Sequence, residues 1–524
     1  MPIIDLAREP SISDLTVSIC IVGSGPGGGF LAAELARAFD GVAVVEAGGG
    51  HAEIDTRESV STVATPRGAL TNLGFSEQLG GTSDVWSGRL AILEPVDFAA
   101  RSWVPHSGWP FGSEVLAPYY EKAATILGLK GLAEFESDHS DLGPAFAGLV
   151  AGGDIALKPF VWLDPPFRVG SYLDEIAARS THNLTLITSA RVRSLHERNG
   201  SRVIEYANVA APDGHTIRVY ARVFVLAAGG IGTPRILLNS TNRSPNGIGN
   251  SNDLVGRFLC THPKANLGIV TLERGVSTAS PLFEKRRNGV GLRRLGLGLS
   301  AATQGACAGL NHYVQLTHEP RRETSDAASG GDAEDSLTGR TPEDAPLPPG
   351  FVARFGRFFR SQLARRAALR PDGRRFVLRA FLDQFPNPDN RVSLAPDVDR
   401  HGDRKVHISW NFTDADRRTV REFFSQLQRE LEHRRVGRVE IDPALANGDW
   451  PLVGIHSHLM GTTRMGDSAR SGVVDRNCRV FACENLYIAG PSTFPTSGYA
   501  NPFLTIAALS LRLADHLKQS IEKR

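Results

Sequence analysis

The chain opens with a strand, a glycine-rich turn and a helix, and this arrangement constrains the fold more than any other feature. Residues 17–22 are mostly apolar with β-branched side chains, and a helical pattern follows over residues 30–39. A second short strand over residues 42–45 leads to Glu46. Strands joined by such a helix run parallel with a right-handed crossover, so residues 17–46 predict a βαβ unit and an α/β, Rossmann-like fold.

The turn of this unit has the spacing GxGxxG at Gly23, Gly25 and Gly28. Glycines at these positions allow a tight turn, a close approach of the backbone to a pyrophosphate, and packing of the helix on the strand. Glu46 stands where a carboxylate can accept hydrogen bonds from the ribose hydroxyls of an adenosine. The pattern therefore predicts a dinucleotide site rather than a turn without a ligand, but it does not distinguish NAD from FAD.

Two later segments repeat the succession of strand and helix, and we expect them to join the same sheet. Residues 223–226 make a strand, and the helix after it is predicted to begin near Thr233-Pro234. Residues 486–488 make another strand, followed by a helix over residues 501–517 with Pro502 in its first turn.

The length of 524 residues exceeds what one hydrophobic core usually supports, so a second domain is expected beside the nucleotide-binding one. Both domains are then discontinuous in sequence. The nucleotide-binding domain is predicted from residues 1–110, 186–265 and 451–524, and an α+β substrate-binding domain from residues 111–185 and 266–450.

Two segments of the second domain have unusual compositions. Residues 320–350 have almost no large apolar side chain. Such a segment cannot bury enough apolar surface to offset the conformational entropy lost on ordering, so we predict a mobile loop, either a lid or a disordered insertion. Arginines and phenylalanines then crowd residues 354–379. We interpret this segment as a basic amphipathic helix packed on the core, with a membrane or partner surface as the weaker alternative.

Charge and cysteine content exclude several classes of protein. The formal net charge is +2 and no zinc-finger or RNA-binding signature is present, so nucleic acid is not an expected partner. The five cysteines are an odd set without a CxxC pair, which argues against a disulfide framework and against a metal site. There is no cationic leader and no apolar stretch of about 18 residues. We therefore expect a cytoplasmic protein without a membrane span.

Further segments resemble a known family. They are GGTSDVWSGRL at 80–90, WVPHSGWPFGSEVLAPYYEKA at 103–123, ARVFVLAAGGIGTPRILLNS at 221–240, and HLMGTTRMG followed by SGYANPFLTIAALSLRLADHL near the end. In this order they resemble the glucose-methanol-choline (GMC) oxidoreductases, closest to the pyranose oxidase and sugar dehydrogenase branch. The resemblance runs from about residue 17 to the C-terminus outside the loop at 320–350. It implies an FAD-dependent oxidoreductase acting on CH–OH donors.

The resemblance also implies the reacting groups. His458 stands in the family's HxxGT motif, and with Asn501 it matches the catalytic pair. A neutral imidazole, with an ordinary pKa near ~6.5, is suited to take a hydroxyl proton, and an asparagine amide can donate to the developing alkoxide. The helix after Pro502 would stabilise a negatively charged reduced flavin through its dipole. His456 is the competing base, and a hydrogen-bonded structural histidine is the alternative interpretation of both.

Contacts to FAD are implied at several other positions. Gly80 and Gly81 permit a close approach of the backbone, and Ser83 offers a hydroxyl. Val85 occupies the place where members with covalent FAD often carry histidine, so non-covalent FAD is expected. The remaining implied contacts are Val192, Ala228, Gly490 and Pro502.

The substrate is less determined than the cofactor. The sugar branch favours a pyranose or glycoside hydroxyl as the substrate. The electron acceptor is oxygen or another compound, with a slight preference for a dehydrogenase or slow oxidase. His262, Gln384, Trp410 and Phe412 could line the pocket but are as readily structural. A lyase with redox-silent FAD, an enzyme of a non-sugar alcohol and a non-catalytic nucleotide-binding subunit are the alternatives.

Overall fold

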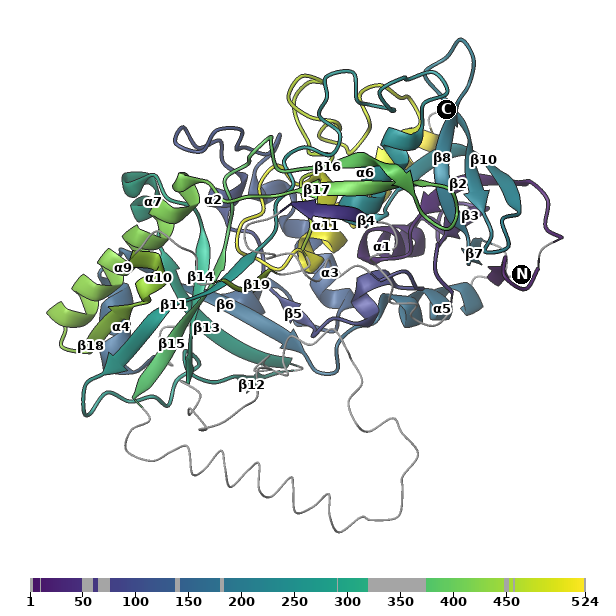
Figure 1. The fold of residues 1–524 in the computed structure, drawn as a ribbon. Helices are drawn as coiled ribbons and strands as arrows, with labels where there is room; N and C mark the ends of the chain where they lie inside the picture. The colour runs from purple at the N-terminus through teal and green to yellow at the C-terminus, as the bar shows by residue number, and fades with distance from the viewer. Residues whose placement is uncertain are drawn as a thin grey trace, which may run out of the picture.

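In the computed structural model the described residues form two large β-sheets and a small one, with the first large sheet on the right of Figure 1 and the second on the left. No helix in the described part of the chain combines the length and apolar character that crossing a membrane requires. The residues that the structure describes are 3–9, 11–49, 60–64, 76–136, 142–179, 183–289, 291–318, 374–446, 452–455 and 458–522.

The first sheet has eight strands in the order β1-β7-β3-β2-β10-β9-β8, with β20 paired to β10. From β1 to β20 the neighbouring strands run parallel, whereas β9 and β8 are added in antiparallel orientation. This sheet confirms the predicted α/β class. Its strands are β1 (Ile3–Asp5), β2 (Leu15–Val22), β3 (Val42–Val45), β7 (Leu184–Thr188), β8 (Arg191–Glu197), β9 (Ile204–Ala210), β10 (Thr216–Leu226) and β20 (Leu486–Ile488).

The predicted βαβ unit is confirmed as β2, helix α1 (Pro26–Leu35) and β3. The helix begins earlier than its apolar pattern indicated, because Gly25 is extended at the N-cap and Pro26 occupies the first helical position, where its missing N–H costs no hydrogen bond. Residues 27–35 of α1 are all buried, so the helix is covered on every side. It packs against α11 (Phe503–Glu522) and α5 (Val169–Arg179).

Helices from distant parts of the chain cover the first sheet. Glu34 of α1 is paired with Lys122 of α3 (Ala117–Ile126) at 2.8 Å and with Lys518 of α11 at 3.1 Å. Helices α3 and α5 come from residues 111–185, the range that the sequence analysis assigned to the substrate-binding domain. Strand β7 begins at the end of this range. The bounds proposed for the two domains stay predictions.

Helix α6 (Gly229–Asn239) begins before the predicted start near Thr233-Pro234, so that prediction is wrong. Pro234 lies inside the helix and has no N–H for the carbonyl oxygen of Gly230. The hydroxyl of Thr462 donates to this oxygen instead, at 2.8 Å. A side chain more than 200 residues away therefore lets the helix start directly after β10.

The second sheet has nine strands, in the order β18-β11-β15-β14-β13-β6-β5 with β12 on β13 and β19 on β11, and β16-β17-β4 form the small sheet. Helix α9 (Asp414–His433) covers the second sheet with an apolar face that includes Val420, Phe423 and Leu427. The strands are β4 (Val60–Ala64), β5 (Arg89–Leu90), β6 (Ile155–Leu163), β11 (Pro263–Leu272), β12 (Arg286–Asn288), β13 (Gly291–Leu299), β14 (His312–His318), β15 (Arg375–Leu382), β16 (Arg391–Val398), β17 (Arg404–Ser409), β18 (Gly437–Ile441) and β19 (Leu452–Ile455). The short helices are α2 (Pro95–Phe98), α4 (Gly143–Ala151), α7 (Ala301–Cys307) and α10 (Pro443–Ala446), and the 3-10 turns are η2 (Gly81–Asp84), η3 (Ser113–Val115), η4 (Leu132–Phe135) and η6 (Pro491–Thr493).

The end of the arginine-rich segment is a strand rather than the predicted helix. In β15, Phe376, Leu378 and Ala380 are buried, and they alternate with Arg375, Val377 and Arg379, which are partly exposed. This is the two-residue period of a half-buried strand. The rest of the predicted amphipathic helix and the predicted mobile loop at 320–350 lie outside the described residues, apart from Arg374.

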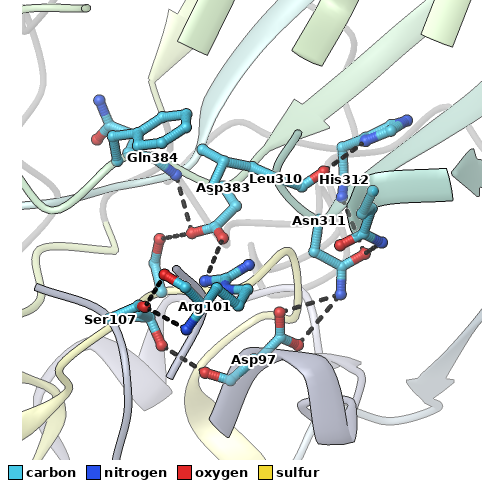
Figure 2. Close-up of polar contacts among 12 residues, drawn as sticks. Asp97, Arg101, Ser107, Leu310, Asn311, His312, Asp383 and Gln384 are labelled. Atoms are coloured by element: carbon cyan, nitrogen blue, oxygen red, sulfur yellow. Dashed lines mark hydrogen bonds and ion pairs between the residues drawn. The ribbon is translucent and has the colours of Figure 1, made fainter. Parts of the chain in front are cut away.

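Buried polar contacts join the loop before α11 to α2 and to the ends of two strands of the second sheet (Figure 2). Asn311, just before β14, donates from Nδ2 to both carboxylate oxygens of Asp97, at 3.0 and 3.2 Å. Thr496 donates its hydroxyl to the backbone oxygen of Asp97, at 2.7 Å. Asp383, just after β15, accepts from the hydroxyl of Ser497 at 2.6 Å and lies 3.8 Å from Arg101.

We predict that Asp97 makes the protein less stable as the pH rises. Burial, followed by the carboxylates of Glu94 and Asp383, raises the pKa of Asp97 to about 7. The folded state then holds a proton that the unfolded chain releases near pH ~4, so the stability is present below that pH and is lost as the pH rises towards about 7. The free energy of unfolding of Asp97→Asn should fall less steeply with pH than that of wild type. Exposed Asp467→Asn is the control, and equal slopes for Asp97→Asn and wild type in denaturant titrations would contradict the prediction.

Candidate active site

Four parallel strands of the first sheet end side by side, and predicted site residues follow each of them. Val22 of β2 is in register with Val45 of β3 and with Leu226 of β10, which in turn pairs with Ile488 of β20. Ligands of open α/β sheets bind at this carboxyl edge. Residues gathered there by the fold include Gly23, Glu46, Ala228 and Gly490.

The three glycines of the turn do different things. Gly23 has a φ of +100°, and a Cβ there would lie 2.7 Å from the carbonyl oxygen of Ala227. A Cβ at Gly28 would lie 1.9 Å from the carbonyl oxygen of Gly23, so this glycine lets α1 pack on the turn. A Cβ at Gly25 would meet nothing within 4 Å. Open space therefore lies beside the N-terminus of α1, where backbone N–H groups and the helix dipole favour an anion.

Glu46 is buried and is already held by the turn. Its Oε2 accepts from the backbone N–H of Ser24 at 2.9 Å and from the Ser24 hydroxyl at 2.6 Å, and its Oε1 accepts from Gly48 at 3.0 Å. Burial raises the pKa of this carboxyl. Sequence reasoning missed Ser24, although it occupies a variable position of the GxGxxG pattern. Its hydroxyl also accepts from the backbone N–H of Gly80 at 3.0 Å, which joins the second glycine segment to the first.

The segment around Gly80 lies against the glycine turn and the start of α11. Gly80 and Gly81 both have positive φ, and a Cβ at Gly81 would lie 3.1 Å from the Cα of Gly25. The buried hydroxyl of Ser83 donates to the backbone oxygen of Gly80 at 2.6 Å and accepts from the N–H of Val169 at 3.2 Å, so it stabilises the segment itself. Trp86 stacks on Phe503 of α11 with the ring centroids 4.0 Å apart.

Val192 and Pro502 lie next to other parts of the same edge. Ala190 donates its N–H to the backbone oxygen of Glu46 at 2.8 Å, so β8 starts beside Glu46 and carries Val192 a short way along. The helix was predicted to begin at Asn501 with Pro502 in its first turn, but α11 begins at Phe503, and the backbone oxygen of Pro502 accepts its first hydrogen bond from Ile506 at 2.8 Å. Asn501 directly precedes Pro502 and is half-buried.

His458 contacts a second histidine that sequence reasoning had assigned only to a possible pocket wall. The Nδ1 atoms of His262 and His458 are 3.0 Å apart. His262 is 1% exposed, whereas His458 keeps part of its surface exposed. Burial, followed by the charges of His262 and Arg89, holds the pKa of His458 well below its ordinary value, so the imidazole is neutral at physiological pH. His456, the competing base, lies outside the described residues.

Arg89 is a charged group of this region that sequence reasoning missed, although it stands in the segment 80–90 used for the resemblance. Its guanidinium lies over aromatic rings of the second sheet, 3.9 Å from the centroid of Phe160 and 4.2 Å from that of Phe381. It lowers the pKa of both histidines by charge repulsion. A fixed positive charge in this position also favours negative charge that develops nearby.

The other proposed pocket residues are parts of a hydrophobic core. The ring N–H of Trp410 donates to Oε1 of Gln384 at 2.9 Å, and the backbone N–H of Thr261 donates to the same oxygen at 2.9 Å. Trp410 and Phe412 pack on each other and are buried. These contacts attach the three side chains to the protein interior, while Nε2 of Gln384 is buried without a hydrogen-bond partner among the described residues.

Comparison with known proteins agrees with this geometry. Residues 386–510 match the sequence profile described as GMC oxidoreductase. Over this segment the chain is therefore similar to the GMC oxidoreductases. It is 27% identical to 6'''-hydroxyparomomycin C oxidase of Streptomyces lividus over 97% of this chain and 93% of that protein. It is 26% identical to paromamine 6'-oxidase of Streptomyces fradiae, over 96% and 91% of the two chains.

Other relatives and a solved structure extend the comparison. The chain is 26% identical to 2-methyl-1,2-propanediol dehydrogenase of Mycolicibacterium austroafricanum, over 96% of this chain and 95% of that protein. Its fold is similar to the crystal structure of pyridoxine 4-oxidase from Mesorbium loti, with a TM-score of 0.58, 18% identity, and coverage of 96% and 99% of the two chains.

The similarity to GMC oxidoreductases implies FAD as the cofactor, and the residues at the sheet edge fit this group. A Cβ at Gly25, Gly229 or Gly490 would meet nothing within 4 Å, so open space follows β2, β10 and β20 at the same edge. The N-terminus of α1 suits the pyrophosphate, and Glu46 suits the adenosine ribose.

We predict that Gly25→Val removes FAD binding without unfolding the protein. The new side chain enters open space and meets no protein atom at its Cβ, yet it occupies the position proposed for the pyrophosphate. The flavin absorbance per protein should fall at least tenfold (roughly 1.4 kcal/mol or more of binding free energy), while the thermal unfolding of the FAD-free protein stays near that of wild type. Gly28→Ala is the matched contrast, because its Cβ meets backbone and should lower the stability by about 1–3 kcal/mol. A Gly25→Val protein that purifies with full flavin content would place the dinucleotide elsewhere.

Proposed function

We propose that this protein is a GMC oxidoreductase that uses FAD to oxidise an alcohol to a carbonyl, with a pyranose or glycoside hydroxyl as the substrate. The observation that carries the proposal is His458, a partly exposed residue with a neutral imidazole in the HxxGT motif. The names of two relatives, oxidases of paromamine and of a hydroxyparomomycin, support a sugar-like substrate. The name of a third, a dehydrogenase of a small diol, favours a non-sugar alcohol as the second candidate.

In the proposed reaction His458 takes the proton of the substrate hydroxyl. The low pKa of His458 keeps the imidazole unprotonated, and therefore ready to accept a proton, at neutral and mildly acidic pH. Asn501 orients the substrate oxygen by donating an amide N–H as alkoxide character develops. FAD, when bound, accepts the hydride from the carbon that carries the hydroxyl.

Several protein features support this division of roles. Asn501 stands at the N-terminus of α11, where the helix dipole favours negative charge. Arg89 supplies a permanent positive charge near the two histidines. The electron acceptor, oxygen or another compound, is left open because the relatives include both oxidases and dehydrogenases. The cytoplasmic location stays a prediction from the sequence.

The FAD should be bound without a covalent link. Val85 stands where a histidine would provide the attachment, and an alkyl side chain cannot form that bond. Precipitation of the purified yellow protein with acid should therefore release the flavin into the supernatant. Flavin that remains in the washed pellet would contradict this prediction and would direct the search to another attachment residue.

Replacing His458 should affect the reaction much more than substrate binding. General-base catalysis contributes roughly 100- to 10,000-fold, or about 3–5 kcal/mol, so His458→Ala should slow anaerobic flavin reduction by that factor. Asn501→Ala should cost about 2–4 kcal/mol as the loss of one donor to the oxyanion. Stopped-flow reduction with a panel of sugars and alcohols measures both effects, after the FAD content of each variant has been checked.

His456→Ala is the control for the assignment of the base. It should reduce its flavin at nearly the wild-type rate. Slow reduction in His456→Ala together with normal reduction in His458→Ala would transfer the role to His456. If no member of the panel bleaches the wild-type flavin, the redox function itself is contradicted and the lyase alternative takes its place.

A further inference from the structure

His262 and His458 are brought together by backbone pairing of two segments almost 200 residues apart. Cys260 and Met460 form an antiparallel bridge and exchange both N–H···O bonds, at 3.1 and 2.9 Å. In this register, positions 262 and 458 are the next pair on the same side of the two chains. The backbone register therefore makes the two side chains neighbours, and their rings then meet at Nδ1.

The geometry of the contact restricts the protons of both rings. Two Nδ1 atoms 3.0 Å apart form a hydrogen bond only if one carries a proton and the other does not. Burial lowers the pKa of His262 to about 4, and the pKa of His458 is also lowered, so both rings are neutral near pH 7. Among the described residues Arg89 is a charged group that acts on both rings, and its positive charge opposes protonation of either ring.

We propose that His262 is a positioning residue that accepts a hydrogen bond at Nδ1 from the Nδ1–H of His458, leaving Nε2 of His458 unprotonated as the base. This inference rests on the proposed function of His458. When Nε2 takes the substrate proton, the Nδ1–H of the resulting imidazolium donates more strongly to His262. His262 keeps its own proton throughout, at Nε2, and the nearby backbone of Ser497 and Gly498 favours the protonated ring.

The arrangement gives His262 and His458 different roles, although both are histidines. His262 is 1% exposed, whereas His458 is a partly exposed residue. The ring of His262 therefore sets the tautomer and the orientation of His458, the residue that meets the substrate in the proposed function. The same principle, in which a second hydrogen bond decides which ring nitrogen is free, applies to histidines in many sites.

Substitutions at His262 test the proposal, because an acceptor can be removed or retained. His262→Leu removes the acceptor and should slow anaerobic flavin reduction roughly ten- to a hundredfold, with little change in the apparent substrate affinity. His262→Asn keeps an acceptor oxygen near the position of Nδ1 and should recover most of the rate. His312→Leu is the matched control, since His312 is an equally buried histidine that contacts Leu310 and Phe423.

A spectroscopic measurement tests the tautomer directly. In holoenzyme labelled with ¹⁵N-histidine, the resonances lost in His458→Ala should report a protonated Nδ1 and an unprotonated Nε2 in wild type. His262→Asn should keep this tautomer. The measurement needs no turnover, so it remains decisive even if His262→Leu fails to fold.

The outcomes separate this inference from the function on which it rests. Normal flavin reduction in His458→Ala contradicts the proposed function. A crippled His458→Ala beside a normal His262→Leu overturns only the role of His262. Equal loss of rate in His262→Asn and His262→Leu, or the opposite tautomer of His458 in the spectrum, also overturns it, because a retained acceptor would then have no effect.

Discussion

Two buried aspartates hold the loop before α11, and the position of the candidate catalytic asparagine depends on them. Ser497 donates its hydroxyl to Asp383 at 2.6 Å, and Thr496 donates to the backbone oxygen of Asp97 at 2.7 Å. Both aspartates are buried, so the hydrogen bonds that they accept offset part of the cost of removing them from water. The loop that ends at Asn501 is thereby attached to the same framework as the second sheet.

The same loop also joins the histidines to this framework. The backbone of Ser497 and Gly498 lies beside His262, which in turn contacts His458 at 3.0 Å. An aspartate after β15, a hydroxyl of the C-terminal loop and two imidazoles thus form one connected series. The result is a base with a low pKa, held in place by groups that are themselves buried and hydrogen-bonded. Such a base needs no activation by a carboxylate to remain neutral at physiological pH.

Several features of the fold could be predicted because they depend on neighbours in sequence. The turn after β2, the helix α1 and the parallel strand β3 follow from glycine spacing and apolar pattern. Predictions from neighbouring residues failed where contacts with distant parts of the chain favoured a different local structure. Pro234 was expected near a helix start, yet the hydroxyl of Thr462 satisfies the carbonyl that the proline leaves free, and α6 begins earlier. The arginines near β15 suggested a helix, but the alternation of buried Phe376 and Leu378 with partly exposed arginines belongs to a strand.

By itself the sequence determined the class of the fold, the dinucleotide turn and the candidate base, since each depends on a pattern of residues that are only a few positions apart. It could not tell Gly25, which faces open space, from Gly28, which packs on the backbone of Gly23. It also could not show that His262 touches His458. That contact depends on the register of Cys260 with Met460, and the pairing of two segments so far apart is decided only when both sheets and their shared loop are packed together.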